Sequence, residues 1–122
     1  MGVEHGQLEA TVHRRESGPA GGPTAIDCGL EYRPGEAVRV SVARREQRIS
    51  VSDDGVAIEK AGRPVRWREV ADRVERALIV NISRRGAVWL PVVATGPGVE
   101  TVVRRIAEAS LDFYQALLEL DD

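Results

Sequence analysis

The chain has 122 residues, which suits one domain with one hydrophobic core, and we predict that residues 1–122 form a single domain. Its formal net charge of −2 excludes a general attraction to nucleic acid or anionic membranes, and no apolar run reaches the ~20 residues that span a bilayer. The first ten residues lack the basic-then-apolar order of a signal peptide. We therefore expect a cytoplasmic protein with no membrane partner.

Two strands and a loop are predicted in the first quarter of the chain. Residues 7–14 and residues 24–32 carry apolar side chains at every second position, which is the pattern of a half-buried strand. Residues 16–23 between them are rich in Gly and Pro and predict a flexible loop. Cys28 is the only cysteine, which excludes an internal disulfide and a Cys-rich zinc site. We interpret it as a small buried hydrophobe, with a reactive thiol as the alternative.

The next strand is predicted over residues 37–44, after a turn at Pro34-Gly35. Its valines occupy alternate positions, and arginine and serine lie between them. This alternation indicates a strand of an antiparallel sheet with one face buried.

The stretch RISVSDDGVAIEKAG, residues 48–62, predicts a hairpin in which Asp53 pairs with Val56, Val51 with Ile58 and Ile49 with Lys60. Asp54-Gly55 is a favoured two-residue turn, because Gly takes a positive φ without steric cost. The register then places four apolar residues on one face: Ile49, Val51, Val56 and Ile58. One alternative is the adenine-contacting box of histidine-kinase-type ATPases, whose second glycine, upstream helix and lid this sequence lacks. The other is a weak cation site at Asp53 and Asp54.

The pattern changes to a helical one after the hairpin. Residues 67–78 have apolar side chains at positions i, i+3, i+4 and i+7, with Arg and Glu on the opposite face, and predict an amphipathic helix. Residues 80–82 and 88–92 then predict a second hairpin. Pro91 has no N–H to donate to a neighbouring strand, so we predict that the last strand lies at an edge of the sheet.

Residues 99–120 give the strongest periodic signal and predict a long amphipathic helix. Its main apolar row is widened by a shoulder of further side chains: Val102, Ala109, Tyr114 and Leu118. We expect part of this shoulder to stay uncovered in a monomer and to form a two-fold interface, unless the sheet is wide enough to cover it. The predicted partner-binding residues are Val102, Ala109, Phe113, Tyr114 and Leu117.

Residues that usually carry catalysis or hold a metal are scarce. His5 and His13 are the only histidines, and their spacing matches no helical metal site. The sequence has no Gly-x-Ser-x-Gly elbow and no P-loop. GPGVET, residues 96–101, is a weak candidate for an anion site at a helix N-terminus, but we interpret it as a helix entry because it lacks the lysine. We therefore predict no cofactor, no metal and no enzymatic activity.

Arginine supplies all but one of the 17 basic residues, which we interpret as the codon usage of a GC-rich genome. Two groups lie at predicted turns, and together they are the predicted anion-binding residues: Arg44, Arg45, Arg48, Arg84 and Arg85. They form one basic patch if the two hairpins point the same way. The simpler interpretation is that charged residues occupy the turns because turns are solvated.

These elements predict an α+β domain of order β-β-β-β-β-α-β-β-α. An antiparallel sheet, made of a meander plus a second hairpin, has both helices packed on one face. From residue 37 to 120 the predicted order is strand-strand-strand-helix-strand-strand-helix, which resembles the type III secretion chaperones in topology. That resemblance implies a homodimer that binds an extended segment of a client protein.

We therefore expect a non-catalytic protein-binding or chaperone-like module, homodimeric through the C-terminal helix and able to bind a protein client. The alternative is nucleic-acid or anionic-ligand binding through the Arg-rich hairpin tips, with nucleic acid the less favoured partner because the chain is acidic overall.

Overall fold

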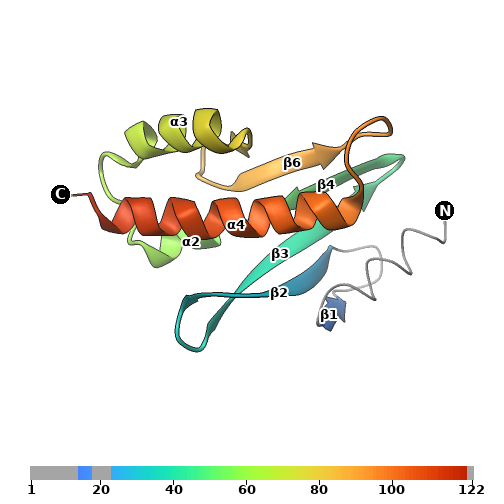
Figure 1. The fold of residues 1–122 in the computed structure, drawn as a ribbon, viewed down its shortest axis with the longest axis horizontal. Helices are drawn as coiled ribbons and strands as arrows, with labels where there is room; N and C mark the ends of the chain where they lie inside the picture. The colour runs from blue at the N-terminus through green and yellow to red at the C-terminus, as the bar shows by residue number, and fades with distance from the viewer. Residues whose placement is uncertain (1–13, 18–22, 121–122) are drawn as a thin grey trace.

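The computed structural model describes residues 14–17 and 23–120, and the strands in this part of the chain form one antiparallel sheet (Figure 1). In chain order they are β1 (Arg14–Ser17), β2 (Thr24–Arg33), β3 (Glu36–Arg45), β4 (Arg48–Ser52), β5 (Asn81–Ile82) and β6 (Val88–Val92). In space they follow the order β1-β2-β3-β4-β6-β5. The helices are α2 (Val56–Lys60), α3 (Trp67–Leu78) and α4 (Val99–Leu118). The predicted α+β class is confirmed.

Strands β2 and β3 form the long hairpin predicted around Pro34-Gly35, and Gly35 has a φ of 84° in the turn. The valines of β3 are buried, and the residues between them are exposed or half-buried, as the valine pattern predicts. The β2–β3 register shifts between Asp27 and Glu31, where Gly29 has a φ of 78° and its N–H donates to the Asp27 carboxylate at 2.9 Å. Such a bulge bends a strand locally, and β2 is one of the strands that contact α4.

The N-terminal predictions are tested only in part. Of the predicted strand 7–14, only Arg14 lies within the described residues. The predicted loop 16–23 is wrong at its start, because Glu16 and Ser17 belong to β1 and pair with Ala25 and Thr24 of β2. Residues 18–22 lie outside the described part of the chain.

The predicted hairpin at Asp54-Gly55 is wrong, because β4 is followed by a helix and not by a strand. Residues 56–60 form α2, and the neighbouring Ala57 and Ile58 are both fully buried. A strand with one face buried would have buried only one of them. Lys60, at the end of α2, binds Glu36 of β3 at 2.8 Å and so holds the helix on the sheet.

The second hairpin is confirmed, but the predicted edge position of its last strand is wrong. β6 lies between β4 and β5, and the short β5 is the edge. Pro91 is tolerated because β5 pairs only with Val88 and Trp89, so within the described part of the chain no strand lies beside Pro91 on that side. The turn between β5 and β6 packs on α2, where a Cβ at Gly86 would lie 2.7 Å from the Ile58 side chain.

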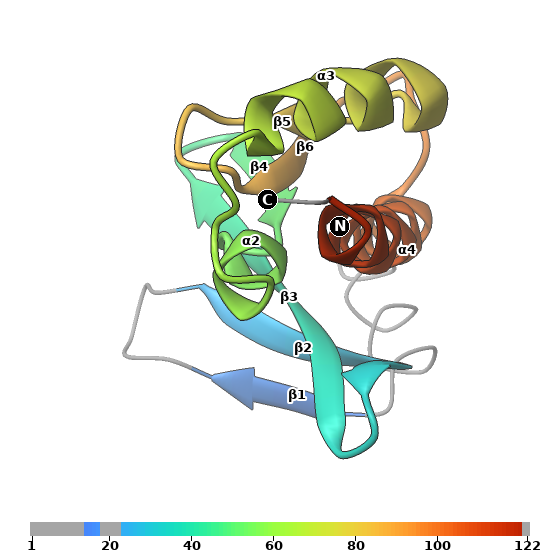
Figure 2. The same cartoon turned by 90° about the vertical axis from the view of Figure 1, so that its left-hand side faces the viewer.

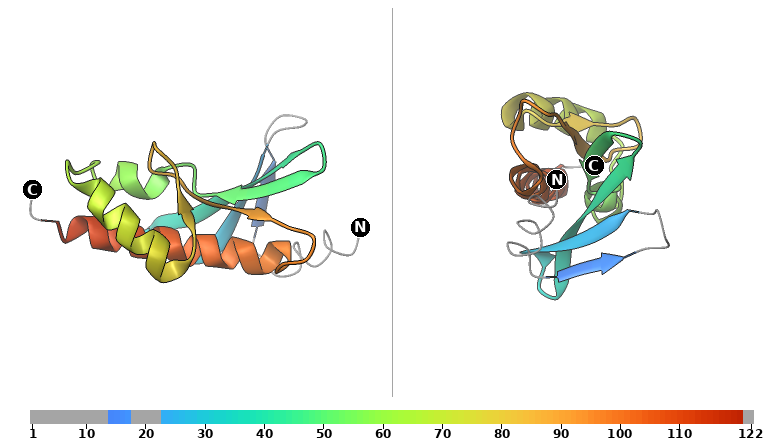
Figure 3. Two further views of the ribbon diagram at one scale, coloured as in Figure 1. Left: turned by 90° about the horizontal axis from the view of Figure 1, so that it is seen from above. Right: turned by 90° about the vertical axis from the view of Figure 1, so that its right-hand side faces the viewer.

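Helix α4 runs along one face of the sheet and contacts β2, β3, β4 and β6, while α2 and α3 contact α4 in turn (Figures 1 and 2). Seen from above, α4 extends along the sheet, and α3 crosses α4 obliquely near the C-terminal end of α4 (Figure 3). The Glu75 carboxylate of α3 accepts a hydrogen bond from the Ile82 N–H at 2.7 Å, which ties α3 to the edge strand. Among the described residues, no helix is long and apolar enough to cross a membrane.

The apolar shoulder predicted on α4 is not left open. The predicted partner-binding side chains are at most 5 % exposed within the single chain: Val102, Ala109, Phe113, Tyr114 and Leu117. The sequence-based argument counted only the sheet as cover, but α2 and α3 also pack against α4. Of the shoulder, only Leu118 is exposed, at 56 %. These core positions are therefore not available as a surface of the folded chain.

Candidate functional site

The side chain of Asp53 lies in the interior, directly after β4, and is 1 % exposed. Its Oδ1 accepts the backbone N–H of Gly55 at 2.8 Å and that of Val88 at 2.9 Å, and its Oδ2 accepts the Ser110 hydroxyl at 2.6 Å. Because Ser110 has one hydroxyl hydrogen, its oxygen is the acceptor for the Tyr32 hydroxyl at 2.7 Å. This buried network joins β2, β4, β6 and α4.

Burial raises the pKa of the Asp53 carboxyl above its usual range, and the hydrogen bonds from Ser110, Gly55 and Val88 oppose that shift. Burial likewise raises the pKa of Tyr32. Within the described residues, no buried side-chain nitrogen or oxygen lacks a hydrogen-bond partner. Each acceptor and donor of the network is already used inside the fold, so the arrangement suits a structural role better than a reaction.

Asp53 and Asp54 do not share a site, because one carboxylate points inward and the other is exposed. The Asp54 carboxylate accepts the Ser41 hydroxyl, and the Asp54 N–H donates to Ser52 Oγ at 2.9 Å. Asp54 lines a cavity of about 440 Å³ together with Glu59, Arg63 and Arg85, so acidic and basic groups are mixed there. Across residues 14–17 and 23–120, no group of three His, Cys, Asp or Glu residues is placed to hold a metal ion.

Cys28 is partly buried in β2, and its pKa is raised to about 11 by burial and by the nearby Asp27 carboxylate, although Arg104 lowers it. At neutral pH the thiol is therefore protonated, which disfavours the reactive-thiol alternative. His5 and His13 lie outside the described residues.

The two predicted Arg groups do not form one patch. Arg44, Arg45 and Arg48 surround the β3–β4 turn. In the register of β4 and β6, Ile49 pairs with Val92 and Ser52 pairs with Trp89. The β3–β4 turn therefore lies beside the end of β6, whereas Arg84 and Arg85 precede its start, at the opposite end of the strand (Figure 1).

Arg84 and Arg85 form the tip of a turn that two other arginines hold in place. The Arg63 guanidinium donates to the Arg85 carbonyl at 3.1 Å, and the Arg68 guanidinium donates to the Arg84 carbonyl at 3.3 Å. Arg68 also stacks on the Trp67 ring, 4.5 Å from its centroid. The side chains of Arg84 and Arg85 are left exposed at this tip.

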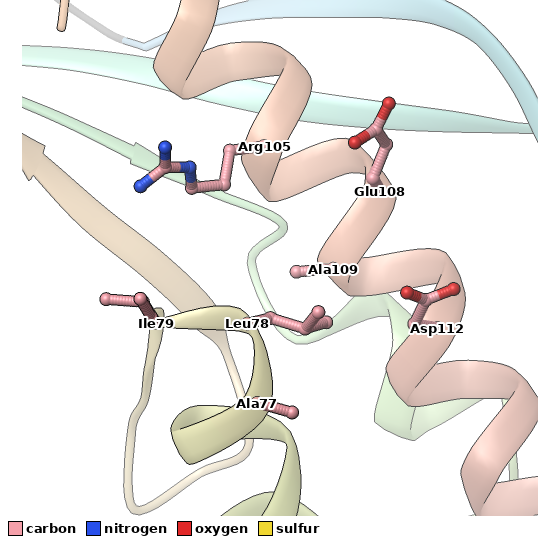
Figure 4. A pocket seen from close by; sticks show the side chains of 7 residues that line it. All are labelled: Ala77, Leu78, Ile79, Arg105, Glu108, Ala109 and Asp112. Carbon is pink, nitrogen blue, oxygen red and sulfur yellow. The ribbon is translucent and has the colours of Figure 1, made fainter.

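A groove lies between the end of α3 and the middle of α4, with a volume of about 310 Å³ (Figure 4). We call it the α3–α4 groove; its lining residues are Ala77, Leu78, Ile79, Arg105, Glu108, Ala109 and Asp112. Its apolar residues come mainly from the end of α3, and its charged residues all come from α4. Figure 4 shows Leu78 directed toward Ala109.

Ile79 is unusual in both backbone and exposure. It follows the last residue of α3 with φ 56° and ψ 55°, and its N–H donates to the Glu75 carbonyl at 3.0 Å. Gly is the usual residue at such a left-handed helix end, because a side chain with a branched Cβ clashes there. Despite this strain, the Ile79 side chain is 72 % exposed and lines the groove.

Sequence reasoning missed both Asp53 and Ile79 as distinctive positions. Asp53 was predicted beside a turn, and its burial depends on Val88 and Ser110, which are 35 and 57 residues away along the chain. Ile79 looked like the first residue of the next strand, since LIVNI, residues 78–82, is an apolar run. The sequence offered one signal for Ile79: a residue other than Gly stands directly after a predicted helix, where Gly is the usual residue.

Comparisons with protein-family models, curated proteins and solved structures find no match. The strand order that suggested the type III secretion chaperones required a strand over residues 56–60, where the structure has α2.

Proposed function

We propose that this protein is a non-catalytic protein-binding module and that its docking site is the α3–α4 groove. The observation that carries the proposal is the exposed Ile79 side chain in a left-handed backbone. A non-Gly residue in this conformation costs about 1–2 kcal/mol, and an exposed side chain regains little of that by packing in the chain. Burial of Ile79 against a partner offsets the cost.

The remaining chemistry supports a binding role over a catalytic one. Asp53, the buried acid, is enclosed and fully hydrogen-bonded, so a substrate has no access to it. Cys28 carries a thiol whose raised pKa disfavours the nucleophilic thiolate. The α3–α4 groove, in contrast, combines an apolar floor with charged side chains along one rim, as protein-binding surfaces do.

The homodimer expected from the sequence remains a proposal, but it has to use a contact surface other than the one predicted. The core side chains of α4 are covered within the chain, so any contact between copies uses the exposed side of the helix. A client protein is the other occupant that the groove accepts.

Selection of peptides from a displayed library of amphipathic helices tests the docking site. We expect selected peptides to bind the wild-type chain and to lose affinity by about tenfold or more for Ile79→Gly, because one large apolar contact is removed. Arg45→Ala, at the far end of the sheet, is the matched control and should bind unchanged. Peptides that bind Ile79→Gly as well as the wild type would place the site elsewhere, and a selection that yields no binder would contradict the proposal.

A second candidate is anion binding at the β5–β6 turn, favoured by the way Arg63 and Arg68 hold the backbone of Arg84 and Arg85. Affinity for a short random duplex should then fall steeply as salt is raised, and Arg84→Ala with Arg85→Ala should flatten that slope. We expect only weak binding at low salt, because the chain is acidic overall. Tight binding at physiological salt that the double substitution removes would favour this candidate over the first.

A further inference from the structure

We propose that the occupant of the α3–α4 groove is a second copy of this chain, with the two α4 helices antiparallel across a two-fold axis. This inference rests on the proposed docking role of the groove. It commits to one partner because Arg105 and Asp112, two of the three charged residues that α4 contributes to the groove, complement each other across a two-fold axis, which outweighs the Glu108 side chains that meet beside it.

The charges on the groove side of α4 have an order that a two-fold axis can use. Arg105, Glu108 and Asp112 are exposed and line the groove, with the cation nearer the start of the helix and the two acids nearer its end. Their spacing of three and then four residues places them on one face of the helix. None of the three side chains forms an ion pair with another residue in the described part of the chain.

An axis that passes between Glu108 and Ala109 sets Arg105 opposite Asp112 of the second copy, and Asp112 opposite Arg105 of the second copy. The two-fold axis repeats this contact, so the antiparallel arrangement makes two equivalent ion pairs, each between Arg105 of one copy and Asp112 of the other. A parallel arrangement would instead place Arg105 against its own counterpart, and like charges at an interface disfavour that alternative.

The apolar residues of the groove fit the same arrangement. Ala109 lies at the level of the proposed axis but is 1 % exposed, so the contact between copies is made by the exposed side chains around it. Leu78 points toward Ala109, whereas the Ile79 side chain points away from it at the outer side of the groove (Figure 4). There the second copy would cover the strained and exposed Ile79. In this interface the apolar contacts supply affinity, and the charges set the orientation.

Charge reversal with sedimentation equilibrium tests this geometry at tens of micromolar protein. The wild type should sediment at twice the 13.3 kDa of one chain. Arg105→Asp and Asp112→Arg, each alone, should raise the dissociation constant by roughly tenfold or more, because each places like charges face to face twice. The double variant restores both pairs with reversed signs and should dimerise again.

Arg104→Asp is the matched control, because it makes the same change of charge on the neighbouring residue. The positive charge of Arg104 lowers the pKa of Cys28 in β2, which places Arg104 on the side of α4 that faces β2 and not the groove. Its substitution should therefore leave the dimer intact. Circular dichroism on each variant confirms that the fold is retained.

Three results would overturn the inference: a wild type that sediments as 13.3 kDa, a dimer that survives both single reversals, or a double variant that stays monomeric. Failure here is distinct from failure of the docking role. A monomeric wild type that still binds selected peptides through Ile79 would keep the groove as a docking site and replace its occupant. A monomer that binds no such peptide would reject both.

Discussion

Asp53 and Ile79 each follow directly on a regular element, β4 and α3, and each reverses the usual placement of polar and apolar side chains. Asp53 is a buried acid, and three groups of the chain donate hydrogen bonds to it. Ile79 is an exposed aliphatic residue in a strained backbone, and the chain leaves most of it uncovered. The first exception is compensated within the fold and indicates a structural role. The second is not compensated within the described part of the chain, and we therefore propose that a partner covers it.

The largest effect should come from Tyr114→Asp. Tyr114 is 2 % exposed and packs edge-on against Tyr32 with ring centroids 5.3 Å apart, so a carboxylate there would be buried without a partner. We expect the chain to unfold, since the cost is about 4 kcal/mol or more against a typical stability of about 5–15 kcal/mol. Urea denaturation measures it. The control Leu118→Asp, at an exposed position of the same helix, should cost well under 1 kcal/mol. A folded Tyr114→Asp chain would move Tyr114 from the core to an interface.

Asp53→Ala should have the next largest effect. It leaves two backbone N–H groups and the Ser110 hydroxyl buried without an acceptor, and each such donor costs about 1–3 kcal/mol. We expect a loss of roughly 3–5 kcal/mol in the free energy of unfolding, also measured with urea. Asp54→Ala is the matched control, one residue away and exposed, and should cost about 1 kcal/mol or less. If Asp54→Ala costs more than Asp53→Ala, the buried hydrogen bonds of Asp53 do not stabilise the fold as described.

A smaller effect should appear in the pH dependence of stability. Because burial raises the folded-state pKa of Asp53 above the unfolded value of about 3.9, the folded chain holds this proton more tightly than the unfolded chain. The contribution of Asp53 is therefore fully present below that pH and is lost as the pH rises through the folded-state pKa. The difference in unfolding free energy between the wild type and Asp53→Asn should shrink as the pH rises from about 4 toward neutrality. A difference that grows over this range would mean that the hydrogen bonds outweigh burial and lower the pKa.

The two residues also separate what a sequence can predict from what it cannot. The alternating valines of β3 and the helical spacings of α3 and α4 were predicted correctly, because each pattern is local and repeats. The five residues of α2 are too few for a periodicity to decide, and Val56 and Ile58 alternate as a strand would. The helix is set instead by the Asp53 carboxylate, whose hydrogen bonds order the Gly55 turn and connect it to Val88 and Ser110.

The site was harder to predict than the fold. Arg84 and Arg85 lie in a turn as predicted, and Arg44, Arg45 and Arg48 lie at the strand ends beside one. Their separation depends on the order of β4 and β6 in the sheet, which no local pattern specifies. The interface predicted on α4 failed for a related reason. The prediction counted only the sheet as cover for α4, with residues 56–60 assigned to that sheet, whereas α2 and α3 also pack against α4.

Thermal unfolding of Ile79→Gly, measured at low protein concentration where a second copy or another partner contributes nothing, tests whether Ile79 is strained and uncovered in the folded chain. Glycine removes the clash of a branched Cβ at positive φ, and the lost side chain is 72 % exposed, so little packing is given up. After the entropic cost of glycine in the unfolded chain, we expect a gain of up to about 1 kcal/mol, a rise of a few degrees in Tm. A loss of more than about 1 kcal/mol would contradict the account, because it would mean that Ile79 is packed within its own chain and not held open for a partner.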